Sequence, residues 1–487
     1  IAEDFLVTQN ITLAEGYEGN AMVVTGYPAS DFIWEELGSD TFNNLLGSYV
    51  LAPRWKVRFA KFDGEVETRA REVIVSVDFK GNPIRFYNKF PENEIGASLS
   101  QSDAKVIADQ ALSDHFNLST SMVSLVSAVE SQKPERLDWI FTYAEDREID
   151  YEGSQFQNII TVSGDQLAGF SQSVYIPEEW ERMKRDREGF SGILAMLFTI
   201  PGGLFIGGLL LIRSFKMLMD RKVNLRKGAL FGGILLISGI VNFFNDSSFL
   251  MTLPTDQPIA NLMSITYIST IAGILIIGLA QALFFGSLGT MLKSTINRSS
   301  LSDSITGGLV AALLVATSAM LIGTFQLDLN PNFPRITLGG SYYPILDTFN
   351  IYGGLFISVA FSLFFAKTLF EWTDGYSNNI KSNIYGILLV MFVYGGEIGM
   401  QYNIGLSLVL ITLYSIVLFM IYKFIIKNNY MLIPFMVLFA RVINIFAGNE
   451  LGAFNSYPNE TILLGVSYAI GLVVWTQLTK FFFDTDQ

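Results

Sequence analysis

Residues 192–213 read GILAMLFTIPGGLFIGGLLLIR and residues 462–483 read ILLGVSYAIGLVVWTQLTKFFF, with further apolar runs of similar length between them. A helix rises about 1.5 Å per residue, so about 20 residues cross the roughly 30 Å hydrocarbon layer of a bilayer. The backbone of such a run must be helical, because an unpaired amide in lipid costs several kcal/mol. We therefore expect an α-helical polytopic membrane protein in contact with the lipid bilayer.

The chain before these runs has the composition of a water-soluble domain. Residues 1–190 hold 32 Asp and Glu against 17 Lys and Arg, a net charge of −15, so the negative net charge of the chain, −13, comes from this part. We expect two parts, an acidic α+β domain over 1–190 and a membrane domain over 191–487. Nine spans are predicted, near 191–212, 228–247, 262–292, 305–326, 346–370, 384–402, 404–426, 430–448 and 460–482.

The soluble domain alternates apolar and polar residues as strands do. Such runs occupy 54–62, 71–90, 122–131, 137–146 and 157–177, and residues 103–116 have helical spacing, with Ser102 expected as the cap. VSVDFKGNPIRF (75–86) and ITVSGDQLAGF (160–170) share one pattern, which predicts two copies of a small α+β unit resembling the PepSY type of extracytoplasmic domain. The charged segment 177–190 is expected to be helical, with Trp180 at the lipid headgroups.

Loop charges predict the orientation. Basic residues cluster in loops on one side, and the opposite loops (248–261, 327–345, 403 and 449–459) contain only Arg335. By the positive-inside rule the basic side is cytoplasmic. With nine spans, residues 1–190 lie outside a bacterial-type inner or plasma membrane and the carboxyl terminus lies in the cytoplasm. We expect a removed signal peptide or an anchor helix upstream of Ile1.

A few polar side chains interrupt the predicted spans. Glu397 and Arg441 have opposite charge and similar distances from the basic ends of their helices, so we expect them to pair, with Gln401 and Asn444 completing the cluster. The pair either fixes helix register or belongs to a substrate or proton site.

The numbers of cysteine and histidine residues limit the kinds of catalytic and metal sites that the chain can form. The chain has no Cys, and its only His is His115, in the soluble part. These counts exclude thiolate metal sites, zinc chemistry of the HExxH kind and a Ser–His relay in the membrane, and we expect no metal and no cofactor. His115 is expected to face solvent near a helix end. An acidic domain without a basic patch predicts no nucleic-acid partner.

The segments IPEEWERMKRDREG (176–189), GGLFIGGLLLIRSFK (202–216) and GALFGGILLISGIVNFFNDSSFLMTLPTD (228–256), followed by a long third helix, resemble a known family. It is the CAAX protease and bacteriocin-processing (CPBP) intramembrane protease family, in a branch with an external PepSY-like domain. The resemblance covers most of residues 50–370. It implies three motifs, Glu-Glu-x-x-x-Arg, Phe-x-x-x-His and His-x-x-x-Asn/Asp, which activate a water molecule.

The motifs are incomplete in this chain. In FEWTDGY, Glu371 is retained, whereas Trp372 replaces the second Glu and Tyr376 replaces the Arg. FVYGGEIG (392–399) has no His, and in FARVIN, Ala440 replaces the His while Asn444 is retained. Glu371, Glu397 and Asn444 are therefore the remaining catalytic candidates.

Three functions follow from these observations. The first is a non-catalytic scaffold or accessory subunit that binds other membrane protein subunits. The second is an intramembrane peptidase that uses carboxylates alone, with Glu371 or Glu397 as the base. The third is a transporter or channel component with Glu397 and Arg441 on the pathway.

Overall fold

The computed structural model describes residues 1–24, 28–51, 54–65, 69–78, 80–147, 149–246, 248–255, 259–292, 300–323, 344–395 and 404–450, together with 469, 471 and 473. The chain divides into two compact units. One contains Ile1–Glu181 and Phe244–Ser269, and the other contains Arg182–Phe243 and most of the chain after Ser269.

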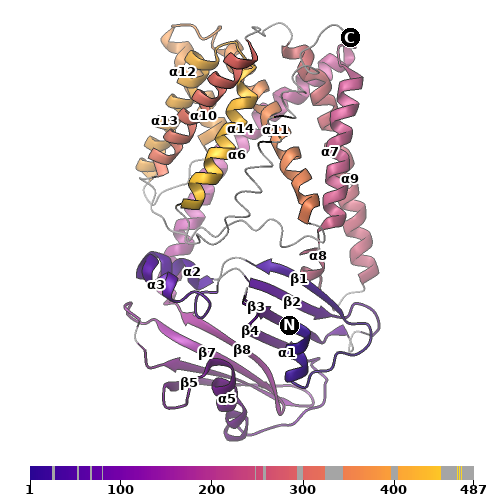
Figure 1. Ribbon diagram of the computed structural model, residues 1–487, viewed down its shortest axis with the longest axis vertical. Coiled ribbons are helices and arrows are strands. Elements are labelled where there is room, and N and C mark those ends of the chain that lie inside the picture. Colours follow the sequence, from indigo (N-terminus) through magenta and orange to yellow (C-terminus); the bar gives the residue numbers. More distant parts are fainter. Residues whose placement is uncertain are drawn as a thin grey trace. The chain divides into compact units, whose positions relative to one another are not determined.

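The first unit is built on an antiparallel sheet of eight strands in the order β1-β2-β3-β4-β8-β7-β6-β5 (Figure 1). The strands are β1 (Glu18–Val24), β2 (Arg54–Ala60), β3 (Glu72–Val77), β4 (Pro83–Lys89), β5 (Val123–Gln132), β6 (Leu137–Glu145), β7 (Gln155–Ser163) and β8 (Gln166–Tyr175). The α+β domain expected before the membrane helices is therefore present, with its strands in one continuous sheet.

Two hairpins meet at the centre of this sheet. They are β3–β4 and β7–β8, and they contain the two segments of similar sequence, 75–86 and 160–170. Strand β4 pairs with β8, so that Phe86 lies opposite Phe170 and Tyr87 opposite Gly169. A Cβ at Gly169 would lie 3.0 Å from the carbonyl oxygen of Phe86, so this close approach favours glycine.

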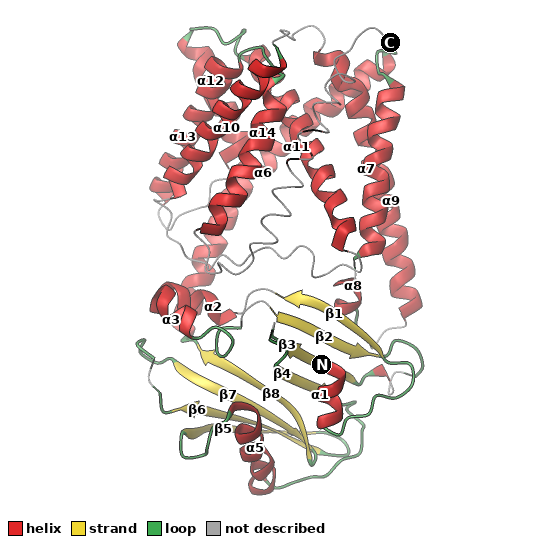
Figure 2. Cartoon of the chain, viewed as in Figure 1, coloured by secondary structure: helices red, strands yellow, loops and turns green. Residues whose placement is uncertain are grey.

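Two helices cover one face of the sheet, α1 (Ala2–Thr8) and α5 (Gln101–Phe116), as Figure 2 shows. Phe5 of α1 meets Phe86 edge-on, with 5.4 Å between ring centroids. Helix α5 is capped by Ser100, whose Oγ accepts the amide of Asp103 at 3.3 Å. The expected cap at Ser102 is therefore wrong by two residues, because Ser100 is the last residue with extended backbone.

Short helical segments follow β1. They are α2 (Pro28–Phe32), the π-helical η1 (Ile33–Leu37) and α3 (Gly38–Asn44). Trp180 is only 4% exposed, meets Phe32 edge-on at 5.1 Å and donates its indole N–H to Glu36 at 2.7 Å. The expectation that Trp180 lies at the lipid headgroups is wrong, since its ring belongs to the core of the sheet domain.

The connection between two membrane helices also belongs to the first unit. It contains α8 (Ser248–Thr252), and Leu253 packs with Ala60 and Phe62 of the sheet domain. Arg58 of β2 donates to the carbonyl oxygen of Leu250 at 2.9 Å. The first unit thus includes the described connection that follows α7 as well as Ile1–Glu181.

The second unit is helical. Its helices are α6 (Glu178–Met219), α7 (Leu225–Asn245), α9 (Ile259–Leu292), α10 (Leu301–Gly323), α11 (Pro344–Trp372), α12 (Ile380–Tyr394), α13 (Ile404–Met420) with the π-helical η3 (Ile421–Ile426), and α14 (Leu432–Glu450). The ends of α6, α7 and α9 belong to the first unit. The charged segment 177–190 and the first span form one continuous helix, α6, with Pro201 inside it.

Six of these helices are long and apolar enough to cross a membrane. They are Met196–Met219, Leu225–Asn245, Leu262–Leu292, Leu301–Ile322, Gly354–Trp372 and Gly405–Ile426. Two shorter apolar helices, Ile380–Tyr394 and Leu432–Asn444, overlap parts of the expected sixth and eighth spans, 384–402 and 430–448. The ninth, 460–482, lies outside the described residues apart from three positions. The chain is therefore a membrane protein with a soluble amino-terminal domain.

Candidate functional site

Glu371, one of the catalytic candidates expected from the sequence, lies near the end of α11. Its Oε2 is 2.8 Å from Nη2 of Arg213 on α6, and its Oε1 is 3.4 Å from Nζ of Lys367, one turn earlier on α11. The Glu371 side chain is 38% exposed and that of Lys367 only 10% exposed. Each carboxylate oxygen of Glu371 therefore faces one cation.

Aromatic and aliphatic side chains surround this ion-pair cluster. The Arg213 guanidinium lies over the ring of Phe364, 5.7 Å from its centroid. Buried residues of α11 fill the interior on the same helix as Glu371: Leu355, Val359, Ala360, Leu363, Phe364, Phe365, Ala366 and Leu369. The ring of Trp372 meets Phe205 of α6 edge-on at 5.2 Å. Helices α6 and α11 are thus joined by both charge and ring contacts.

A tight turn follows Glu371. Asp374, Gly375 and Tyr376 all have positive φ, between 49° and 71°, which reverses the chain before α12. Thr373 accepts the amide of Tyr376 on its hydroxyl at 3.2 Å, and its carbonyl accepts the hydroxyl of Ser382 at 2.7 Å. The turn is therefore fixed to the start of α12 by short-range hydrogen bonds.

Tyr376, the residue expected at the position of the motif arginine, is buried in the core. It is 8% exposed and packs edge-on against Phe370 and Phe419, at 5.3 and 6.4 Å. Among the described residues, neither its hydroxyl nor that of the buried Tyr430 has a hydrogen-bond partner. Tyr376 therefore contributes to the packing of the helical core.

The four residues of the expected polar cluster are only partly described. Glu397 and Gln401 lie outside the described residues, so their pairing with Arg441 and Asn444 stays a prediction. Arg441 and Asn444 lie about one turn apart on α14, and both are exposed. Asn444 is therefore not part of the buried core of the helical unit.

His115 does not face solvent as expected. Its ring is half-buried and stacks on Phe170, with 4.0 Å between centroids and 15° between planes, and Phe5 meets it edge-on at 6.2 Å. Burial lowers the pKa of His115 below its usual 6.5, although Asp114 opposes the shift. The imidazole serves as a core ring in the sheet domain.

No set of three or more His, Asp or Glu side chains that could hold a metal ion occurs among the described residues. Sequence reasoning missed Lys367 and Arg213 as partners of Glu371. Lys367 could have been found, because residues four apart share a helix face. Arg213 lies inside α6, and only the packing of α6 against α11 brings it to Glu371.

Comparisons with known proteins give no relative for this chain. No family model, no curated protein and no solved structure matches it.

Proposed function

We propose that this chain is a non-catalytic membrane subunit, a divergent CPBP-like scaffold that presents a PepSY-like acidic domain outside the cell and binds other membrane proteins. The observation that carries the proposal is the state of Glu371. Both of its oxygens are paired with cations, Arg213 and Lys367, so the carboxylate serves to join α6 and α11.

A hydrolytic role would need a free base. A general base must reach the proton it removes through an available lone pair, directly or through one water molecule. The retained glutamate is engaged at both oxygens, the motif arginine is a buried tyrosine, and the only histidine stacks in the sheet domain. Within the part of the chain that the structure describes, which leaves out Glu397, the glutamate expected to activate water is therefore ion-paired and the expected histidines are replaced.

The scaffold role is supported by how the chain builds its soluble unit. Residues 244–269, between α7 and α9, share this unit with Ile1–Glu181. Arg58 and Glu72 of the sheet bind the backbone of Leu250 and the hydroxyl of Thr255 in this connection. A partner that binds the sheet domain would thus act on three membrane helices, α6, α7 and α9.

The proposal is tested with the full chain purified in mild detergent from its native membranes. We expect a stoichiometric membrane-protein partner and no cleavage of membrane peptides by the chain alone. Cleavage that is lost in both Glu371→Gln and Glu397→Gln would contradict the proposal and favour the peptidase. An Asp303→Asn variant, which removes an exposed carboxylate at the start of α10, controls for loss of charge.

The proposed orientation can be tested by cysteine labelling, because the chain has no cysteine that would give a background signal. Single cysteines replace two exposed serines, Ser121 in the sheet domain and Ser302 at the start of α10. A membrane-impermeant maleimide should label Ser121→Cys in intact cells and Ser302→Cys only after permeabilisation. The reverse pattern would place the sheet domain in the cytoplasm.

A further inference from the structure

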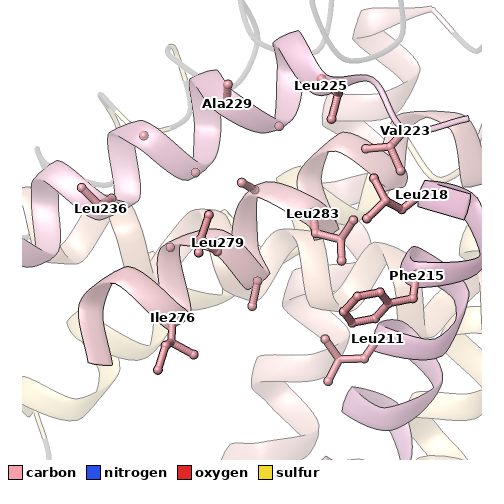
Figure 3. A pocket seen from close by; sticks show the side chains of 16 residues that line it. Leu211, Phe215, Leu218, Val223, Leu225, Ala229, Leu236, Ile276, Leu279 and Leu283 are labelled. Carbon is pink, nitrogen blue, oxygen red and sulfur yellow. The ribbon is translucent and has the colours of Figure 1, made fainter. Parts of the chain in front are cut away.

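An apolar groove runs between α6, α7 and α9, with a volume of about 740 Å³. Figure 3 shows Leu211, Phe215 and Leu218 of α6 on one wall, Leu225 and Leu236 on α7, and Ile276, Leu279 and Leu283 on α9. Its floor forms where α7 meets α9 closely, because a Cβ on Gly228 or Gly232 would overlap Ala282. A Cβ on Gly233, which also lines the groove, would meet nothing within 4 Å.

The length of the groove matches one leaflet. Its lining on α7 extends from Leu225 to Leu236, which at 1.5 Å per residue is about 16 Å. This is half of the roughly 30 Å hydrocarbon layer. A transmembrane helix from a partner would need a complementary surface along the whole layer, so the groove is better matched to an acyl chain.

One end of the groove is basic. Val223, in the connection between α6 and α7, lines the groove. Residues 216–227, on both sides of Val223 in the sequence, include five basic residues and one acidic residue, Asp220. The five are Lys216, Arg221, Lys222, Arg226 and Lys227. Four of them, all but the half-buried Lys227, are exposed, and Lys222 lies 3.4 Å from Asp220.

Hydrogen bonds hold this basic connection against α9. The amide of Asn224 donates to the carbonyl of Gly286 at 2.9 Å, and the hydroxyl of Thr290 donates to the carbonyl of Lys222 at 3.1 Å. Gly286 lies one turn beyond Leu283, the last lining residue of α9. The backbone of this basic connection is therefore held where the groove ends.

We propose that the groove binds a phospholipid with an anionic headgroup. One acyl chain occupies the apolar groove, and the phosphate and headgroup lie among the basic residues of the α6–α7 connection. Apolar burial alone would accept any lipid, whereas each basic residue near the surface contributes about 1 kcal/mol, or roughly fivefold, to binding an anionic one. The site should therefore select by headgroup charge. This inference is independent of the scaffold proposal.

The test is native mass spectrometry of the full chain, released from vesicles that contain equal amounts of phosphatidylcholine and phosphatidylglycerol. We expect one retained phosphatidylglycerol in preference to phosphatidylcholine. Replacing Arg221 and Arg226 by Gln should weaken retention of phosphatidylglycerol at least tenfold. The matched control removes two exposed cations elsewhere, Lys381 and Lys427, and should leave retention unchanged.

A second variant tests the groove itself. Gly233→Leu should fill it and reduce lipid retention, whereas Gly354→Leu, at an open glycine on α11, should not. Thermal unfolding in detergent shows whether each variant is folded. Equal retention of both lipids, or a charge preference that survives Gly233→Leu in a folded protein, would overturn the proposal. So would a peptide helix found in the groove.

Discussion

Arg58 and Glu72 form a buried ion pair across β2 and β3, with 2.7 Å between Nη2 and Oε2. Their side chains are 6% and 12% exposed. Each also binds the connection between α7 and α9, Arg58 through the carbonyl of Leu250 and Glu72 through the hydroxyl of Thr255 at 3.0 Å. The pair therefore satisfies the buried polar groups that join this connection to the sheet.

Removing one partner should destabilise the sheet domain strongly. Arg58→Gln removes the buried cation that pairs with Glu72 and leaves the half-exposed Lys89 amine and the Thr255 hydroxyl beside the carboxylate. Breaking a buried pair in this way costs about 3–5 kcal/mol. The measurement is chemical unfolding of the full chain in detergent. Arg71→Gln is the control, because it breaks an ion pair that is partly exposed. Arg71 and Glu94 are each about one-third exposed and 3.6 Å apart, so this change should cost less than about 1 kcal/mol of stability.

The same pair gives a dependence of stability on pH. Burial by itself would raise the pKa of Glu72, but the charge and hydrogen bonds of Arg58 prevail and hold it below its usual 4.5. Because the folded state then binds its proton less readily than the unfolded state, the stabilisation is complete above about pH 4.5 and is lost as pH falls through the lowered value. The stability difference between wild type and Glu72→Gln should shrink between pH 6 and pH 3. A constant difference would contradict the assignment.

The cap of α5 is a local test of the fold. Ser100→Ala removes the side-chain acceptor for the amide of Asp103 and should cost about 1 kcal/mol of stability. Ser102→Ala should cost a few tenths, because Ser102 contacts only the hydroxyl of Ser100 at 2.8 Å. Thermal unfolding of both variants separates the two positions, and equal losses would argue against Ser100 as the cap.

His115 can be titrated directly, because it is the only histidine in the chain. Burial on Phe170 and Phe5 should give a pKa below 6.5 in the folded protein, measured from its imidazole NMR signals. Phe170→Ala exposes the ring and should move the pKa back toward 6.5. A wild-type pKa at or above 6.5 would show that the ring is solvated.

Two adjacent glycines of α7 should respond differently to alanine. Gly232→Ala places a Cβ on that of Ala282 in α9, and such overpacking costs about 1–3 kcal/mol. Gly233→Ala meets nothing within 4 Å and gains helix propensity, so it should be neutral or stabilising. Thermal unfolding in detergent compares them, and similar losses would contradict the close packing of α7 on α9.

Part of the candidate site could be predicted from the sequence. Glu371 was identified from the incomplete motif, and Lys367 follows from helical spacing. The ion pair with Arg213 could not be predicted from the sequence, because 158 positions separate Arg213 from Glu371 and no local pattern relates them. Trp180 and His115 were both assigned to the surface for a similar reason, since their burial depends on Phe32 and Phe170, which are distant in sequence.

The sequence by itself determined that long apolar helices follow an acidic domain of alternating strands, because hydrophobic length and period act within one segment. Only the tertiary structure decided that β4 pairs with β8 to make one sheet, that residues 248–255 join that sheet through Arg58 and Glu72, and that Arg213 meets Glu371. These contacts join segments far apart in the chain. They depend on which faces pack together, and a local pattern of residues does not contain that information.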